Sequence, residues 1–217
     1  AIEHGIAMHN TCAIIKPATV EHLTITDQGI TVHFTAHGTQ HTLNTKILVA
    51  ADGSNSTIRS LIKAPIITKD YQQTALVATV HTAANHNHLA YERFDSNAAI
   101  AMLPLPAAQH SALIWTASTN VITNLLKLNQ TELQHALQAA FGYRLGKIIE
   151  ISTPTTYPLH LISAQQAIHG PIILLGNAAH TVHPLAAQGL NVALQHVHQL
   201  QQQLLMNQAL QRPLSHN

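Results

Sequence analysis

The chain has little of several residue types, and each shortage excludes a class of protein. Its one cysteine, Cys12, cannot form an internal disulfide, and a lone thiol is typical of a reducing compartment. Charged residues make up 9% of the chain, and 10 Lys and Arg nearly balance 9 Asp and Glu, so no basic surface for nucleic acid is expected. No apolar run reaches the ~18 residues that a membrane-spanning helix needs. The sequence therefore predicts neither a nucleic-acid partner nor a disulfide scaffold.

Histidine is the residue type in excess, with 18 copies among 217 residues. Protonation of these side chains near pH 6 would make the chain strongly cationic. His180 and His183 lie three residues apart, and His196 and His198 follow. A metal site needs three or four convergent ligands, and no carboxylate or further cysteine lies near them in the sequence. No metal site is therefore predicted.

The stretch 172–191 organises the chain. Four apolar residues run into Gly176, which predicts a buried parallel strand, and a polar loop with Pro184 follows. Gly189 then opens a segment whose apolar residues share one helical face, namely Leu190, Leu194, Val197 and Leu204. A strand, a loop and a helix N-terminus in this order form cofactor sites in open α/β sheets, because the first helical turn attracts an electron-rich group.

Two further blocks precede this stretch. Residues 1–60 are β-rich, with a three-strand meander over 20–26, 30–34 and 40–45 and a buried parallel strand over 47–51. Short strands at 75–80, 89–94, 100–103 and 112–115 predict a second sheet. A helix is predicted from Thr131, with Gln134 completing a capping box, to Gly142. We therefore expect an α/β fold of mixed α+β character, with domains at 1–70 and 71–160 and a return to the first domain over 161–217.

The sequence Gly176-Asn177-Ala178-Ala179-His180, with Pro184 and the following 188–191, resembles the second FAD motif of the flavin-dependent aromatic hydroxylases. That family, which includes p-hydroxybenzoate hydroxylase, has roughly G-D-A-A-H, then P, then G-x-N. The resemblance implies that Asn177, in place of the usual Asp, contacts the sugar of FAD. It implies that backbone N–H groups of Gly189, Leu190 and Asn191 contact the flavin, and it includes Gly176, Ala178, His180 and Pro184 in the cofactor site.

A second match lies earlier in the chain. The residues from Asp52 and Gly53 to Arg59 resemble the D-G-x-x-S-x-x-R signature of the same family, which implies contacts to FAD and to the nicotinamide pyrophosphate. Ser56 is expected to cap the short helix that contains Arg59. An Asp-Gly pair alone would indicate only a turn. Two signatures in one chain favour the cofactor interpretation.

Other segments resemble the branch of this family that acts on polyprenyl phenols in ubiquinone biosynthesis, including the 2-polyprenyl-6-methoxyphenol hydroxylases. These segments are 91–94, 101–104, 141–148 and 157–159. The resemblance implies a Rossmann-like FAD and NAD(P) domain with an inserted β-sheet substrate domain. It implies an FAD-dependent monooxygenase that uses NAD(P)H and O2 to hydroxylate a phenol ring. The implied location is cytoplasmic, or peripheral at the inner membrane, with association with a membrane surface or a biosynthetic complex left open.

No side chain is assigned as a catalytic acid or base. His183, Pro184 and Tyr91 are candidates for the substrate side, although a solvated loop position suits His183 equally well. Tyr91, Tyr143, Tyr157 and Trp115 could line a ring pocket, and sheet packing is favoured for Trp115. Two alternatives stay open: another flavoenzyme of the same fold, such as a reductase or halogenase, or a non-catalytic or truncated subunit. No G-x-G-x-x-G and no C-terminal helices of the family are present, which favours a fragment.

Alone, the 217-residue chain is expected to bind FAD very weakly or not at all, to lack monooxygenase activity, and to self-associate or depend on a partner. The segment that would cradle the FAD pyrophosphate is missing, and its strand would cover the apolar strands 47–51 and 172–175. The test is to mix the chain with excess FAD, desalt it, and record the flavin spectrum and light scattering. A yellow, stoichiometrically loaded monomer would contradict the expectation.

Overall fold

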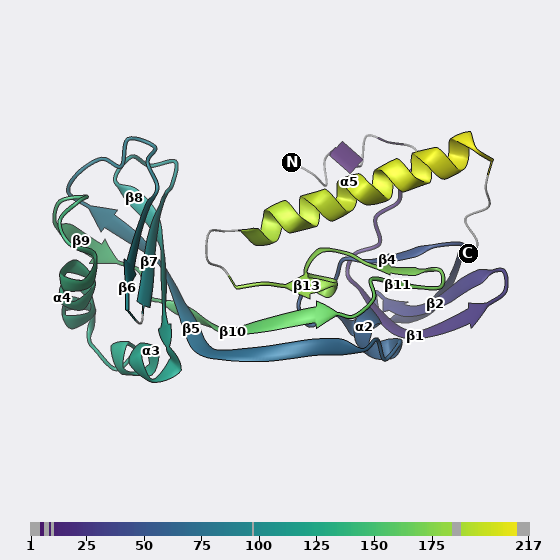
Figure 1. Cartoon of the computed structure of the whole chain (residues 1–217), viewed down its shortest axis with the longest axis horizontal. Coiled ribbons are helices and arrows are strands. Elements are labelled where there is room, and N and C mark those ends of the chain that lie inside the picture. The colour runs from purple at the N-terminus through teal and green to yellow at the C-terminus, as the bar shows by residue number, and fades with distance from the viewer. Residues whose placement is uncertain (1–4, 7–8, 10, 97, 184–187, 212–217) are drawn as a thin grey trace. The chain divides into compact units, whose positions relative to one another are not determined.

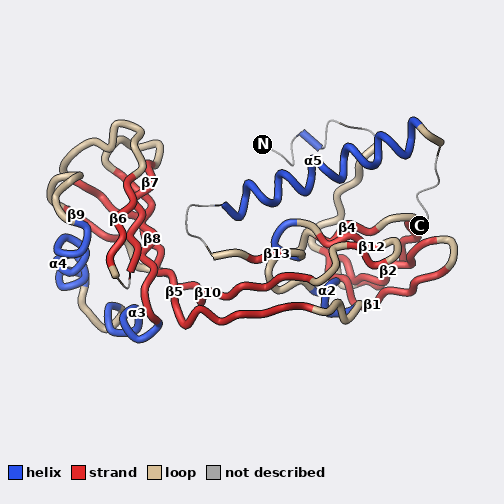
Figure 2. The backbone as a smooth tube through the Cα atoms, viewed as in Figure 1, coloured by secondary structure: helices blue, strands red, loops and turns tan. Residues whose placement is uncertain are grey.

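The computed structural model describes residues 5–6, 9, 11–96, 98–183 and 188–211 (Figure 1). The chain divides into two compact units, one formed by Ala1–Thr68 with Leu161–Asn217 and the other by Lys69–His160. Strands predominate and helices accompany them in both units (Figure 2). The predicted mixed α/β class is therefore confirmed. The assignment of one unit to the cofactor and the other to the substrate stays a prediction.

An antiparallel meander builds one side of the first unit. It consists of β1 (Ala18–Thr26), β2 (Gly29–Ala36) and β3 (Thr39–Thr45), in that order across the sheet. Alternate residues of β2 are buried, as expected for a strand with one face in the core: Ile30, Val32, Phe34 and Ala36. The three-strand meander predicted from the sequence is confirmed.

A small parallel pairing lies beside the meander. Strand β4 (Leu48–Ala50) pairs in parallel with β12 (Ile172–Leu174), and β11 (Ile168–His169) lies antiparallel on the other side of β12. Beyond the strands, the N–H of Leu175 donates to the carbonyl of Ala50 at 2.8 Å. The two predicted parallel strands are thus neighbours, although more than 120 residues separate them in the sequence.

Short elements follow these two strands. The helix α2 (Thr57–Leu61) comes after β4, and the 3-10 helix η1 (Gly176–Ala178) comes after β12. Strand β13 (His180–Thr181) then pairs antiparallel with the end of β10 (Thr155–Ala164). The long helix α5 (Gln188–Ala209) ends the described chain.

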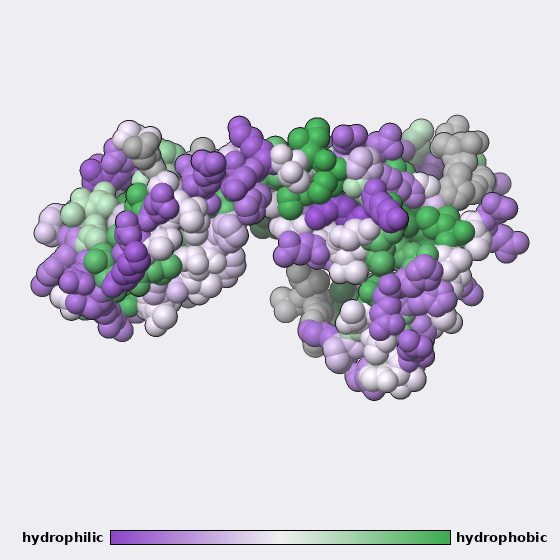
Figure 3. All heavy atoms as spheres, turned by 90° about the horizontal axis from the view of Figure 1, so that it is seen from below, coloured by the Kyte–Doolittle hydropathy of each residue, from purple (hydrophilic) through white to green (hydrophobic). Residues whose placement is uncertain are grey.

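Helix α5 has the predicted position, but its apolar face is not covered by the described residues. Its N-terminal half contacts η1, and none of its side chains is buried. Leu190, Leu194 and Val197 are 69%, 57% and 47% exposed. The elements against which α5 packs are short, so they cover only part of the helix. Figure 3 also shows hydrophobic residues at the surface of this unit, on the right of the view.

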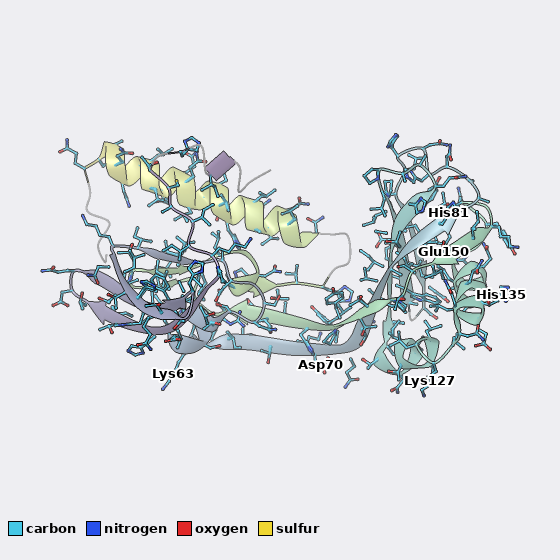
Figure 4. All side chains as sticks on the ribbon, turned by 180° about the vertical axis from the view of Figure 1, so that it is seen from behind. Lys63, Asp70, His81, Lys127, His135 and Glu150 are labelled. Atoms are coloured by element: carbon cyan, nitrogen blue, oxygen red, sulfur yellow. The ribbon has the colours of Figure 1, made fainter. Side chains whose placement is uncertain are left out.

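The second unit is an antiparallel sheet with helices on one face. Its strands are β5 (Ile66–Thr82), β8 (His110–Ser118), β7 (Ala98–Pro104) and β6 (Tyr91–Asp95), and β9 (Ile148–Ile151) also pairs with β5. Glu150 of β9 lies opposite His81 of β5 (Figure 4). Helices α3 (Thr119–Leu125) and α4 (Gln130–Phe141) pack on the sheet. The four predicted strands are confirmed: β5, β7 and β8 are longer than predicted, and β6 begins two residues later and ends one residue later.

The start of α4 differs from the prediction. The N-cap is Asn129 and not Thr131. The Asn129 side chain accepts from the N–H of Glu132 at 3.0 Å, and the Glu132 carboxylate accepts from the Asn129 N–H at 2.9 Å. Asn is a stronger N-cap than Thr, so the capping box forms two residues earlier. Gln134 instead donates to the carbonyl of Ile148. The helix ends at Gly142, as predicted.

Leu137 of α4 is completely buried in the core of the second unit. We expect Leu137→Ala to lower the free energy of unfolding of this unit by ~2–5 kcal/mol, because the lost side chain leaves a cavity. Urea unfolding followed by the fluorescence of Trp115, which lies in the same core, measures the change. Val121→Ala on α3, at a site 46% exposed, is the control and should have little effect. Equal loss in the two variants would contradict the assignment of this core.

Candidate functional site

The two motifs singled out from the sequence meet at one edge of the parallel pair. Asp52 follows the end of β4 by two residues, and Asn177 follows the end of β12 by three. The carboxyl ends of parallel strands face the same side of a sheet, which is where α/β folds bind cofactors. The side chains of Asp52 and Asn177 are both exposed. The parallel pairing therefore places two polar, accessible groups beside each other.

Arg59 ties the two motifs together. Its side chain is only 7% exposed, with Nη1 donating to the carbonyl of Ala178 at 2.9 Å and Nη2 donating to the carbonyl of Ser54 at 2.6 Å. One guanidinium thus joins the segment after β4 to η1. A buried guanidinium is tolerated here because main-chain carbonyls satisfy it. Arg59 was predicted as a cofactor residue, and the geometry gives it the role of holding the site in shape.

The Asp52 turn is ordered by its own hydrogen bonds. Ser56 is the N-cap of α2, and its Oγ accepts from the N–H of Arg59 at 3.0 Å, which confirms the predicted cap. Asp52 Oδ2 accepts from the N–H of Ile58 at 3.1 Å. One carboxylate oxygen is therefore held by the protein, and this orients the other.

Two glycines of the motifs serve different purposes. Gly53 has φ of +86°, and no atom lies within 4 Å of the position that a Cβ would take, so its backbone is open to a neighbouring group. Gly176 has φ of +56°, and a Cβ there would lie 3.3 Å from the Cβ of Ala193. Gly176 and Ala178 are buried, and their small size allows η1 and α5 to approach closely.

His180 joins three elements of the first unit. Its Nδ1 lies 3.0 Å from Ser163 Oγ of β10, and its ring centroid lies 5.4 Å from that of His196 on α5. Burial, and then the nearby His196, lower the pKa of His180 below 6.5. Burial also lowers the pKa of His183. Both rings are therefore neutral at neutral pH.

Ser163 is not among the site residues that the sequence predicts, and His196 enters there only in the rejected metal interpretation. Helical periodicity could have indicated His196, because it lies one turn beyond the residues of α5 that face η1. Nothing in the sequence pairs Ser163 with His180, since the register of β10 and β13 decides that contact.

The N-terminus of α5 completes this region. The Cβ of a side chain at Gly189 would meet nothing closer than Val182 Cγ2 at 4.0 Å, so the protein leaves room there. Leu190 is exposed, and Asn191 Nδ2 donates to Gln188 Oε1 at 3.4 Å. Pro184 lies outside the described residues. Gly189, Leu190 and Asn191 thus stay predicted cofactor contacts in an accessible first turn.

The predicted aromatic candidates belong to the other unit. The Tyr91 ring lies edge-on to Phe141, 6.4 Å between centroids, and packs against the core. Trp115 is buried in the same core, so the favoured packing interpretation is confirmed. Tyr143 and Tyr157 are 74% and 55% exposed. Among the described residues, no group of three or more His, Cys, Asp and Glu side chains could hold a metal ion.

Removal of the Arg59 guanidinium should loosen the junction of the two motifs. In Arg59→Met the carbonyls of Ala178 and Ser54 lose their charged donor. We expect this loss to lower the free energy of local opening at the junction by ~1.5–3 kcal/mol. Hydrogen exchange at the amides of Ala178 and Ala179 measures it. Arg59→Lys should lie between Met and wild type, because one ammonium group cannot span both carbonyls. Unchanged protection in Arg59→Met would show that the bridge does not hold η1.

Comparison with known proteins supplies the family. Residues 4–211 match the model of the family described as FAD binding domain. The ubiquinone hydroxylase UbiL of Rhodospirillum rubrum is 34% identical over 169 residues, which cover 78% of this chain and 39% of that protein. The mitochondrial ubiquinone biosynthesis monooxygenase COQ6 of Homo sapiens is 30% identical over 200 residues, covering 76% of this chain and 42% of that protein.

A solved structure shares the fold. The p-nitrophenol 4-monooxygenase PnpA of Pseudomonas putida superposes with a TM-score of 0.63 at 19% identity, over 80% of this chain and 44% of that one. The chain spans less than half the length of the two curated relatives above. The family match covers nearly the whole chain, and it includes both motifs that Arg59 joins. The chain therefore belongs to the FAD binding domain family, as its two motifs predicted.

Proposed function

We propose that this chain forms the FAD-holding region of a monooxygenase that hydroxylates a polyprenyl phenol ring in ubiquinone biosynthesis, with NAD(P)H and O2 as co-substrates. The observation that carries the proposal is the junction of the two motifs, with Asp52 and Asn177 exposed at the ends of neighbouring parallel strands. The names of the curated relatives supply the pathway, since they are a ubiquinone hydroxylase and a ubiquinone biosynthesis monooxygenase.

The residues present fit FAD by their chemistry. The Asp52 carboxylate, already oriented by the Ile58 N–H, accepts hydrogen bonds, and the Asn177 amide both donates and accepts them. These groups suit the hydroxyls of a sugar. The open backbone at Gly53 allows a close approach, and the first turn of α5 offers N–H groups to an electron-rich ring edge. When bound, FAD supplies the redox chemistry, and the protein supplies position and electrostatics.

Apart from the Asp52 carboxylate and the buried Arg59 guanidinium, the named side chains of the site are uncharged. Asn177 carries no charge where the family has a carboxylate, and the lowered pKa values keep His180 and His183 neutral at neutral pH. The Arg59 guanidinium donates its hydrogen bonds to main-chain carbonyls. We assign no side chain as an acid or base. On this proposal the residues orient the cofactor and leave the proton chemistry to other groups.

The substrate side of the site is part of this proposal. We propose His183 and Pro184, which follow the second motif in the sequence, as substrate-side residues, and we propose the unit 69–160, which contains Tyr91, as the substrate domain. A polyprenyl tail is apolar, so the site would open to a membrane surface or to a lipid-handling partner. Within the described residues, no helix is long and apolar enough to cross a membrane. Peripheral association with the inner membrane fits a substrate of this kind.

Asn177→Ala in the whole protein should weaken FAD binding by ~0.5–1.5 kcal/mol, the worth of one uncharged hydrogen bond. The Asn177 side chain is exposed, so its loss should not disturb the fold. Titration with FAD, followed by flavin fluorescence, gives the dissociation constants. Asn85→Ala, at an exposed position in the other unit, is the matched control. Equal constants for Asn177→Ala and wild type would show that Asn177 does not touch the cofactor.

Gly189→Val in the whole protein should abolish hydroxylation and leave the fold largely intact. The protein itself leaves space at this position, so an added side chain would collide only with a group bound at the first turn of α5. The assay measures hydroxylated polyprenyl phenol formed with NAD(P)H, FAD and O2, beside circular dichroism of the variant. Turnover near that of wild type would remove this turn from the site. If the wild-type protein consumes NAD(P)H and O2 without hydroxylating any phenol, the proposed activity is wrong.

A further inference from the structure

The segment that carries the second motif has an unusual charge pattern. Residues 161–211 contain no Asp, Glu, Lys or Arg. Their only side chains that titrate near neutral pH are histidines, namely His169, His180, His183, His196 and His198. The charge of this segment is therefore set by the protonation of its histidines.

Helix α5 rests on the rest of the first unit through few contacts. Ala193 lies against Gly176, Gly189 lies near Val182, and the His196 ring lies against His180. No residue of α5 is buried. The described contacts that hold α5 on η1 and β13 are thus made at the surface of the unit, with no buried α5 side chain.

The contact between the two imidazoles disfavours a positive charge on His180 while the helix is docked. The ring centroids are 5.4 Å apart, so two positive charges would repel in a partly buried place. No carboxylate faces the pair from the described elements around it. Ser163 of β10 is uncharged, η1 presents Asn177, and α5 adds only His198. The Arg59 guanidinium, bonded to the carbonyl of Ala178 two residues before His180, is also positive.

We propose that His196 is a positioning residue for the candidate cofactor site: its ring contact with His180, which Ser163 also holds, keeps the first half of α5 on η1, and acid releases the helix. The inference rests on the proposed function, because it concerns the helix whose first turn would contact FAD. His196 and Ser163 both contact His180, and neither is itself among the proposed cofactor contacts. They act through His180 and through the position of α5.

The direction of the pH dependence follows from the state that binds more protons. The pKa of His180 is lowered in the docked state by burial and by His196, so the released helix takes up protons more readily. Docking is thus fully present above pH 6.5 and is lost as the pH falls below it. From about pH 7.5 to about pH 5.5, the constant for helix opening should rise, by at most about tenfold for His180.

Hydrogen exchange at the amides of Ala193 to Leu200, corrected for the intrinsic pH dependence of exchange, measures this opening without any cofactor. In wild type the opening constant should rise on acidification. His180→Gln should remove the part of the rise that comes from His180, and His196→Gln should reduce it by a smaller amount, because His196 is the second cause of the lowered His180 pKa after burial. His198→Gln removes a histidine of α5 that makes no ring contact with His180 and should behave as wild type. An opening constant that is the same at both pH values in wild type, or equal effects of His196→Gln and His198→Gln, would overturn the proposal.

FAD titration of the whole protein at the two pH values connects the pair to the site. Wild type should bind FAD more weakly at the lower pH, and His196→Gln should show a smaller loss. If α5 opens in acid while the FAD affinity of wild type stays constant, the pair does not position the cofactor site, and this inference fails. Absence of FAD binding even at the higher pH would instead refute the proposed function. The two failures are thus separate.

Discussion

The bridge made by Arg59 is the interaction on which the rest of the site depends. A guanidinium presents several N–H donors in a fixed plane, so one side chain can hold two carbonyls that belong to different segments. Here those carbonyls belong to Ser54 and Ala178, and 119 residues separate Arg59 from Ala178 in the sequence. The parallel pairing of β4 and β12 brings the segments side by side. The bridge then fixes the turn after one strand against the turn after the other.

This arrangement leaves the polar groups of the two turns pointing outward while the small residues between them are buried. Ala178 and Ala179 are fully buried, whereas Asn177 beside them is exposed. Small side chains let η1 lie against α5, and the positive φ of Gly176 turns the chain there. The Asp52 turn uses its own carboxylate and Ser56 to start α2. Groups that order the backbone and groups that remain accessible are thus different members of the same motifs.

The two units differ in how they are stabilised. The unit 69–160 has a continuous core between its sheet and the helices α3 and α4, with Leu76, Leu137 and Leu145 almost fully buried. In the other unit the core lies between the meander and the β4–β12 pair, and α5 contributes no buried side chain to it. The described contacts of α5 with this unit include the approach of Ala193 to Gly176 and the ring contact of His196 with His180. On the inference above, protonation of His180 therefore matters more for this helix than for any element of the compact core.

The sequence by itself determined the elements and the family. Alternating and continuous apolar runs predicted the meander, the strand at 47–51, the strand before Gly176 and the helix after Gly189, because local periodicity decides which face of an element can be buried. The letters around Asp52 and Asn177 identified the FAD binding family. The capping box of α4 was placed two residues late, since Thr131 and Asn129 both satisfy a local pattern and only the Asn129 side chain reaches the right N–H.

Only the tertiary structure decided that Arg59 bonds to Ala178, that Ser163 and His196 meet at His180, and that the apolar face of α5 is left open by the described residues. Such contacts join segments far apart along the chain, and strand register and packing set them, whereas sequence patterns report only neighbours within a few residues.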